Sequence, residues 1–306
     1  MEQTKKITDI LKSKQFTISV ELVPPRNGTD PDSLMSKIER LNGKVDFISV
    51  TKGAGGSMRG GTIPISYFAQ QNHKMTALAH FVCRERTSAE IENELMDLYW
   101  FKIKNVLALR GDPPAGAKDE EWDGDYKYAY RLANQINNMN QGKYIPRKNF
   151  DKGEFREGFA TDFCILVAGH PEDPIDKEVE HMKCKIESGA SVIITQMIFS
   201  FDEYKNYVEG LGKAGIDLPV IAGIRPLLTY KDIESCEKFF GLKVCDELKS
   251  LLKDKTAAEA RKAGIRYTVD LIKKLKGFGA PGVHLFVLND VDLVSELIEP
   301  LEKEVQ

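Results

Sequence analysis

The sequence predicts a single-domain α/β protein with the fold of a (β/α)8 TIM barrel. Short apolar runs rich in β-branched residues recur along the chain, and longer segments with helical periodicity follow them. This alternation indicates βαβ units around a parallel sheet, and about eight such units close a barrel. A length of 306 residues with 42% hydrophobic content is sufficient for one large core.

The strand candidates follow one another in strict sequential order. They are 16–22, 45–51, 75–80, 105–109, 162–167, 191–196, 220–224 and 282–287. In the first of them apolar and polar residues alternate, so Thr17, Ser19 and Glu21 share one face. We expect this polar face to point into the barrel lumen.

The helical candidates lie between the strands and include 32–41, 88–102, 126–139, 175–188, 202–214 and 256–275. Residues 140–161 are polar, contain glycine and proline, and are longer than a usual connection, so they are predicted to form a surface excursion of the single domain 1–306. A doubly wound sheet is the second interpretation. Neither Gly-rich turn, 53–56 or 277–279, has the GxGxxG spacing of a dinucleotide-binding fold.

Composition argues against several functional classes. The 43 Lys and Arg residues are balanced by 46 Asp and Glu residues, so the net charge of -3 gives no basic surface for nucleic acid. The five cysteines are odd in number and contain no CxxC pair, which predicts reduced thiols and no metal site. Residues 1–13 lack the apolar run of a signal peptide or membrane span. We therefore expect a soluble, cytoplasmic protein without a membrane partner.

Glu21 is the first candidate for catalysis. It lies near the carboxyl end of the first strand, just before Pro24-Pro25, and catalytic groups of TIM barrels lie at the carboxyl ends of strands. Burial in the lumen would raise the pKa of this carboxyl group, which suits a general acid near neutral pH. The alternative is an ion-paired structural carboxylate.

Three other strand ends carry polar side chains. The fourth strand leads into Arg110-Gly111-Asp112, a turn that can hold a polar cofactor edge or form a local salt bridge. Gln196 interrupts an apolar stretch, where its amide can bind a heteroaromatic edge or be a satisfied core glutamine. His80 ends the third strand, and a lone histidine there is more often structural, since no second histidine has metal-ligand spacing.

Several segments together resemble the signatures of the methylenetetrahydrofolate reductase family. The first and fourth strands supply SVELVPP at 19–25 and LALRGDPP at 107–114. Five further segments follow in the family's order and cover nearly the whole chain: VTKGAGGS at 50–57, Tyr128-Ala129, VAGHPE at 167–172, ITQM at 194–197 and AGIRP at 222–226.

The resemblance implies an FAD-containing barrel and a set of binding residues. Those expected around the flavin or its nucleotide tail are Thr51, Lys52, His80, Arg110, Gly111, Asp112, Tyr128, Ala129, His170 and Lys185. Those expected to face the substrates are Gln196, Cys236 and Leu288. Cationic side chains and backbone amides in the first set could neutralise a pyrophosphate, and Tyr128 offers an aromatic face.

The implied reaction is reduction of 5,10-methylenetetrahydrofolate to 5-methyltetrahydrofolate, which supplies methyl groups for methionine synthesis. Hydride would pass from NAD(P)H through FAD to the folate by a ping-pong mechanism. Opening the five-membered ring of the folate requires a proton at nitrogen and leaves an electron-poor iminium. Glu21 is therefore assigned as the general acid, Asp112 as the nearby stabilising charge, and Gln196 as the ligand of the pterin edge.

Four residues depart from the family pattern. Lys52 replaces an aromatic residue, His170 a tyrosine, Asp290 a basic residue and Cys236 a bulkier apolar one. Loss of a cation at position 290 weakens the prediction of ordinary NAD(P)H use. NADH is the favoured donor, and a partner flavoprotein or a ferredoxin-linked subunit is the alternative.

Two other functions compete with the reductase. One is a folate-binding barrel that transfers a methyl group without redox chemistry and binds no flavin. The other is a non-catalytic binding subunit that retains the cofactor without turnover. Retention of Glu21, Asp112 and Gln196 together favours the reductase. The resemblance also suggests a homo-oligomer.

Overall fold

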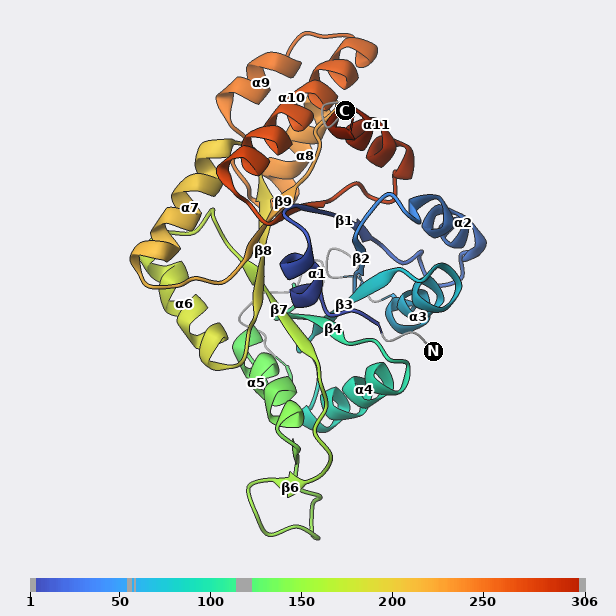
Figure 1. Cartoon of the computed structure of the whole chain (residues 1–306), viewed down its shortest axis with the longest axis vertical. Helices are drawn as coiled ribbons and strands as arrows, with labels where there is room; N and C mark the ends of the chain where they lie inside the picture. The colour runs from blue at the N-terminus through green and yellow to red at the C-terminus, as the bar shows by residue number, and fades with distance from the viewer. Residues whose placement is uncertain (1–3, 54–56, 58, 114–122, 303–306) are drawn as a thin grey trace.

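Eight parallel strands form a closed barrel in the computed structural model, which describes residues 4–53, 57, 59–113 and 123–302 (Figure 1). Their order around the barrel is β1-β2-β3-β4-β7-β8-β9-β10, and β10 pairs with β1 to close it. Their bounds are β1 Thr17–Leu22, β2 Phe47–Val50, β3 Thr76–Val82, β4 Asn105–Leu109, β7 Cys164–Gly169, β8 Val192–Ile198, β9 Val220–Ile224 and β10 Gly282–Leu285. The predicted TIM barrel is confirmed.

A ring of helices surrounds the barrel in Figure 1. These are α2 Asp32–Leu41, α3 Thr62–His73, α4 Ser88–Trp100, α5 Ala129–Asn140, α6 Ile175–Glu187, α7 Phe201–Lys213, α8 Tyr230–Phe240, α9 Asp246–Leu252, α10 Ala257–Phe278 and α11 Val291–Glu302. Three of them begin with a capping box, in which a threonine and the acidic residue three positions later satisfy each other's backbone N–H groups. These caps fix where α4, α8 and α10 start.

A short antiparallel hairpin lies between α5 and β7. Its strands are β5, Lys143–Tyr144, and β6, Arg156–Glu157, and they form a two-stranded sheet separate from the barrel. Figure 1 shows this segment projecting from the lower end of the molecule. It occupies the range in which the sequence predicts a surface excursion.

The N-terminal helix α1, Ile7–Ser13, closes the end of the barrel where the strands begin. The N–H of Ile7 donates to Oδ1 of Asn105 at 2.8 Å, and Nδ2 of Asn105 donates to the carbonyl of Lys5 at 3.1 Å. The Ile7 side chain is fully buried among lumen residues such as Phe47 and Leu78. In Figure 1 this helix lies across the centre of the barrel.

Side chains alternate between two cores along each strand, as the strand geometry requires. Val20 and Leu22 of β1 pack outward in the core beneath the helices. Thr17 and Ser19 are also fully buried, and the hydroxyl of Ser19 hydrogen-bonds to His284, its partner on the neighbouring strand β10. The lumen face of β1 is therefore polar, and it ends at Glu21.

Close packing of α10 supports the loop that follows β9. A Cβ at Gly264 would lie 2.1 Å from the carbonyl oxygen of Leu227. We expect Gly264→Ala to lower the free energy of unfolding by about 1–3 kcal/mol through overpacking. Gly277→Ala in the same helix is the control, because its Cβ meets nothing within 4 Å and alanine favours the helix. Urea unfolding would compare them, and equal effects would contradict the prediction.

Among the described residues, none of the helices combines the length and apolar character needed to cross a bilayer.

Candidate functional site

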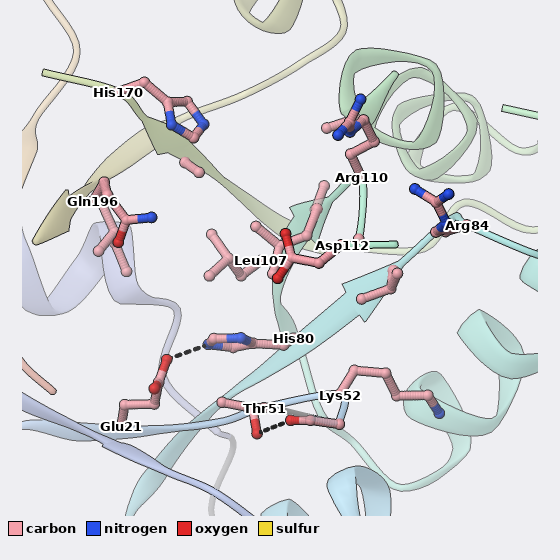
Figure 2. A pocket seen from close by; sticks show the side chains of 18 of the residues that line it. Glu21, Thr51, Lys52, His80, Arg84, Leu107, Arg110, Asp112, His170 and Gln196 are labelled. Carbon is pink, nitrogen blue, oxygen red and sulfur yellow. Dashed lines mark hydrogen bonds and ion pairs between the residues drawn. The ribbon is translucent and has the colours of Figure 1, made fainter. Parts of the chain in front are cut away.

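A cavity of about 1350 Å³ opens at the carboxyl ends of the strands. It exceeds the usual size of a pocket for one small ligand, roughly 300–1,000 Å³. Most of the predicted site residues line it: Glu21, Thr51, Lys52, His80, Arg110, Gly111, Asp112, Tyr128, Ala129, His170, Lys185, Gln196 and Leu288. Figure 2 shows Glu21, His80, Asp112 and Gln196 directed toward a common space.

Glu21 lies at the bottom of this space with its side chain 16% exposed. Its Oε2 is 3.8 Å from Nε2 of His80, the contact drawn in Figure 2. Burial raises the pKa of Glu21 to about 7, although the positive charge of Arg225 acts in the opposite direction. Burial lowers the pKa of His80 to about 3. At neutral pH the histidine is therefore uncharged, and Glu21 is poised to exchange a proton.

His284 on β10 lies in the lumen, where it hydrogen-bonds to two serine hydroxyls. Its Nδ1 is 2.8 Å from Oγ of Ser19, and its Nε2 is 3.0 Å from Oγ of Ser49. Burial and the nearby His80 lower its pKa to about 3, so the ring is neutral and bridges β1 and β2. His284 is not among the site residues predicted from the sequence. A histidine among the apolar residues of 282–287 was the available signal.

Lys185, which lines the cavity, lies near the buried carboxylate of Glu178. Lys185 is 8% exposed, donates to the carbonyl of Ala168 at 2.8 Å, and has a pKa lowered by burial. Glu178 is fully buried, and its Oε1 accepts hydrogen bonds from the backbone N–H of His170 at 3.0 Å and from the Tyr207 hydroxyl at 2.9 Å. Its Oε2 has no hydrogen-bond partner among the described residues. This pair positions the loop that carries His170.

Lys52 forms an ion pair with Glu94 of α4, which also binds Arg86. Figure 2 shows the Lys52 side chain directed away from Glu21. Lysine in place of an aromatic residue at position 52 therefore adds a positive charge, and Glu94 in the wall of the cavity balances it.

Gly111 allows the loop after β4 to pass close to the loop after β3. The backbone N–H of Arg84 donates to the carbonyl of Arg110 at 3.0 Å. Gly111 has a φ of +94°, and a Cβ there would lie 2.2 Å from Cγ1 of Val82. This packing holds Asp112 at the cavity. Pro114 of the same motif, and residues 54–56 of the other Gly-rich turn, lie outside the described residues.

Two positions lie away from the cavity lining. Cys236 is completely buried in the apolar cluster that includes Phe199 and Val244, so its predicted substrate contact has no support in this placement. Phe240, one helical turn later in α8, lines the cavity. Asp290 accepts a hydrogen bond from the backbone N–H of Leu293 at 3.1 Å and so caps the first turn of α11.

No group of three or more His, Cys, Asp or Glu side chains in the described ranges is arranged to hold a metal ion. The site is instead built from one carboxyl group of raised pKa, neutral histidines, an amide and several cations around a large cavity. Such a set can bind a large polar ligand and transfer a proton within it.

Comparison with known proteins identifies relatives along nearly the whole chain. A family model described as methylenetetrahydrofolate reductase matches residues 6–302. Methylenetetrahydrofolate reductase 1 of Schizosaccharomyces pombe is 29% identical over 300 residues, which cover 94% of this chain and 46% of that protein. Methylenetetrahydrofolate reductase (NADH) 1 of Arabidopsis thaliana is 29% identical over 307 residues, 94% of this chain and 49% of that protein. The chain thus spans about half the length of these two relatives.

A shorter relative matches over most of its own length. The 5,10-methylenetetrahydrofolate reductase of Salmonella typhimurium is 26% identical over 287 residues, 91% of this chain and 88% of that protein. Among solved structures, an uncharacterized protein from Clostridium thermocellum, described as binding two copies of 5-methyl-5,6,7,8-tetrahydrofolic acid, has a TM-score of 0.62 at 13% identity, covering 99% of this chain and 100% of that one. At this identity the likeness shows the shared fold.

Proposed function

Because this chain belongs to the methylenetetrahydrofolate reductase family, we propose that it reduces 5,10-methylenetetrahydrofolate to 5-methyltetrahydrofolate. The observation that carries the proposal is the placement of Glu21, Asp112 and Gln196 around one cavity at the carboxyl end of the barrel. The product would supply methyl groups for methionine synthesis. The solved structure described as binding a methylated tetrahydrofolate supports a folate as the ligand class.

The donor set around the cavity fits FAD. Nε2 of His80 is buried and has no hydrogen-bond partner among the described residues, as expected of a group that a ligand satisfies. Arg110 and Lys185 would neutralise the pyrophosphate, and Tyr128, stacked on Tyr130 with ring centroids 5.4 Å apart, offers an aromatic surface. When bound, FAD would supply a two-electron carrier that takes a hydride from the donor and returns it to the folate.

Proton transfer is the part of the reaction assigned to Glu21. The carboxyl group donates its proton to the folate nitrogen whose bond to the one-carbon bridge breaks, and the bridge becomes an iminium on the other nitrogen. A pKa of about 7 keeps a large share of Glu21 protonated at neutral pH. Asp112 would place a negative charge beside the iminium, which then accepts hydride to become the methyl group.

Gln196 is expected to hold the pterin edge. Its Oε1 accepts the backbone N–H of Met197 at 3.0 Å, and its amide nitrogen points toward the centre of the cavity (Figure 2). Gln196→Ala should weaken folate binding by about tenfold, the loss expected for a good hydrogen bond to a ligand, and leave flavin affinity unchanged. Titration with 5-methyltetrahydrofolate would measure the first and flavin fluorescence the second. Equal losses of both ligands would contradict the assignment.

NADH is the proposed donor, supported by the name of the Arabidopsis thaliana relative, methylenetetrahydrofolate reductase (NADH) 1. The test is a visible absorption spectrum of the purified protein, recorded anaerobically after NADH and then after methylenetetrahydrofolate. Oxidised-flavin bands that bleach with NADH and return with the folate are the expected result. Bleaching only by dithionite, followed by recovery with the folate, would replace the donor with a partner protein. A protein that cannot be reconstituted with FAD would overturn the proposal.

A further inference from the structure

A guanidinium lies against an aromatic ring at the edge of the cavity, outside the set of site residues that the sequence predicts. Arg225 follows the last residue of β9 and lines the cavity, as does Phe240 at the end of α8. The Cζ atom of Arg225 is 5.5 Å from the centroid of the Phe240 ring. This ring is 45% exposed, so the guanidinium ends beside the open side of the cavity.

The charge of Arg225 has no close counterion in the described part of the chain. The cations Lys52 and Arg86 on the other wall both pair with Glu94, whereas no described carboxylate forms an ion pair with Arg225. Its field reaches Glu21 at longer range. A guanidinium that lies over an aromatic ring and lacks an ion pair is suited to receive a carboxylate from a ligand.

An exposed apolar side chain lines the cavity after β10, the strand that neighbours β9. Leu288, in the loop after β10, is 62% exposed and has a left-handed backbone with a φ of +51°. The next residue, Asn289, fixes this loop, because its side-chain amide bonds to both the N–H and the carbonyl of Val23 at 2.8 Å. These bonds hold the loop, and with it the Leu288 side chain, at the edge of the cavity.

We infer that Arg225, held against Phe240, receives the glutamate carboxylate of the folate tail. A folate ends in this glutamate, which follows its pterin and its aromatic ring. The inference rests on the proposed function. It adds that recognition of the glutamate lets the protein distinguish a folate from a pteroate. The cation for the tail then comes from the end of β9, while Asp290 serves as a helix cap.

The test compares two ligands that differ only in the glutamate: 5-methyltetrahydrofolate and 5-methyltetrahydropteroate. Their dissociation constants would be measured by calorimetry for the FAD-loaded protein and for Arg225→Met, which keeps an unbranched apolar stem without the charge. The variant is expected to bind the folate about tenfold more weakly and the pteroate with unchanged affinity. Arg225→Lys, which keeps the charge but not the planar stack, should lie between them.

The matched control is Lys238→Met. Lys238 lies over the Phe239 ring at 5.6 Å on the same helix, but neither residue lines the cavity, so both ligands should bind this variant normally. If Arg225→Met is too unstable, Phe240→Leu provides the second test, and it should reduce the preference for the folate over the pteroate.

The outcomes separate the inference from the function on which it rests. Wild-type protein that binds the folate without preference over the pteroate, or Arg225→Met that weakens both ligands equally, would overturn the inference and leave the reductase assignment standing. Wild-type protein that binds FAD but neither pterin ligand would overturn the proposed function and the inference with it.

Discussion

Glu21→Gln is expected to abolish folate reduction while leaving reduction of the flavin by its donor within about twofold of the wild-type rate. Glutamine has nearly the same shape as glutamate, so it keeps the lumen filled, but it cannot donate a carboxyl proton to the folate nitrogen. Loss of a general acid costs about 10²–10⁴ in rate. Anaerobic stopped-flow absorbance would measure each half-reaction separately.

The pH dependence of the wild-type folate half-reaction follows from the same group. Glu21 must be protonated to act, and its pKa is raised to about 7, so the rate should fall as pH rises through about 7. Because the folded protein binds this proton more tightly than the unfolded chain, the free energy of unfolding should also fall as pH rises between 4.5 and about 7. In Glu21→Gln neither the folate half-reaction nor the free energy of unfolding should show this dependence on pH.

Asp112→Asn is a useful comparison for this prediction, since it removes a charge from the same cavity without removing the proton donor. If Glu21→Gln slows reduction of the flavin as much as it slows the folate half-reaction, Glu21 is a structural carboxylate. A wild-type folate rate that is constant through the neutral range would lead to the same conclusion.

Gly111→Ala is expected to yield protein that has lost most of its flavin. The new methyl group would lie 2.2 Å from Cγ1 of Val82 and 3.1 Å from Cβ of Arg84, at a φ of +94° that alanine disfavours. The loop must then move away from β3, and Arg110 and Asp112 move with it. We expect FAD affinity to fall by about a hundredfold, together with about 2–4 kcal/mol of stability from overpacking and backbone strain.

Gly279→Ala is the matched control for the cost of placing alanine at a positive φ. Gly279 has a φ of +97°, but a Cβ there meets nothing within 4 Å, and it lies at the end of α10 away from the cavity. This variant should lose about 1–2 kcal/mol and retain its flavin. Flavin release on dilution and thermal unfolding would compare the two proteins. Retention of flavin by Gly111→Ala would mean that the 110–112 loop does not contribute to cofactor binding.

The order of the strands could be predicted because β-branched runs and turn residues mark each strand locally. Strands β4 and β9 match their predicted ranges, while β3 and β8 extend two residues further than expected. Helix α1 was not predicted, because seven residues carry too little periodicity to distinguish a helix from a polar terminus. Its position depends on Asn105, about a hundred residues away, and no local pattern encodes that contact.

The candidate site was predictable where a polar side chain ends an apolar strand, as Glu21 and Gln196 do. His284 and Arg225 were missed for different reasons. His284 acquires its role from serines of β1 and β2, more than two hundred residues distant. Arg225 stands among apolar residues and proline in a segment that the family resemblance treats as a unit, and its stacking on Phe240 depends on where α8 ends. Cys236 shows the converse, because its place in the family pattern suggested a substrate contact, whereas its side chain is buried in an apolar cluster away from the cavity lining.

The hydrogen bond between Ser19 and His284 joins the first strand of the barrel to the last. During synthesis Thr51, His80 and Asp112 leave the ribosome well before His284 does, and a domain generally folds as a unit. The surroundings that tune Glu21 are therefore completed by the last strand, after most of the cofactor-binding loops exist. A chain ending before β10 would lack the strand that pairs with both β1 and β9, so turnover reports that the whole barrel has been made and closed.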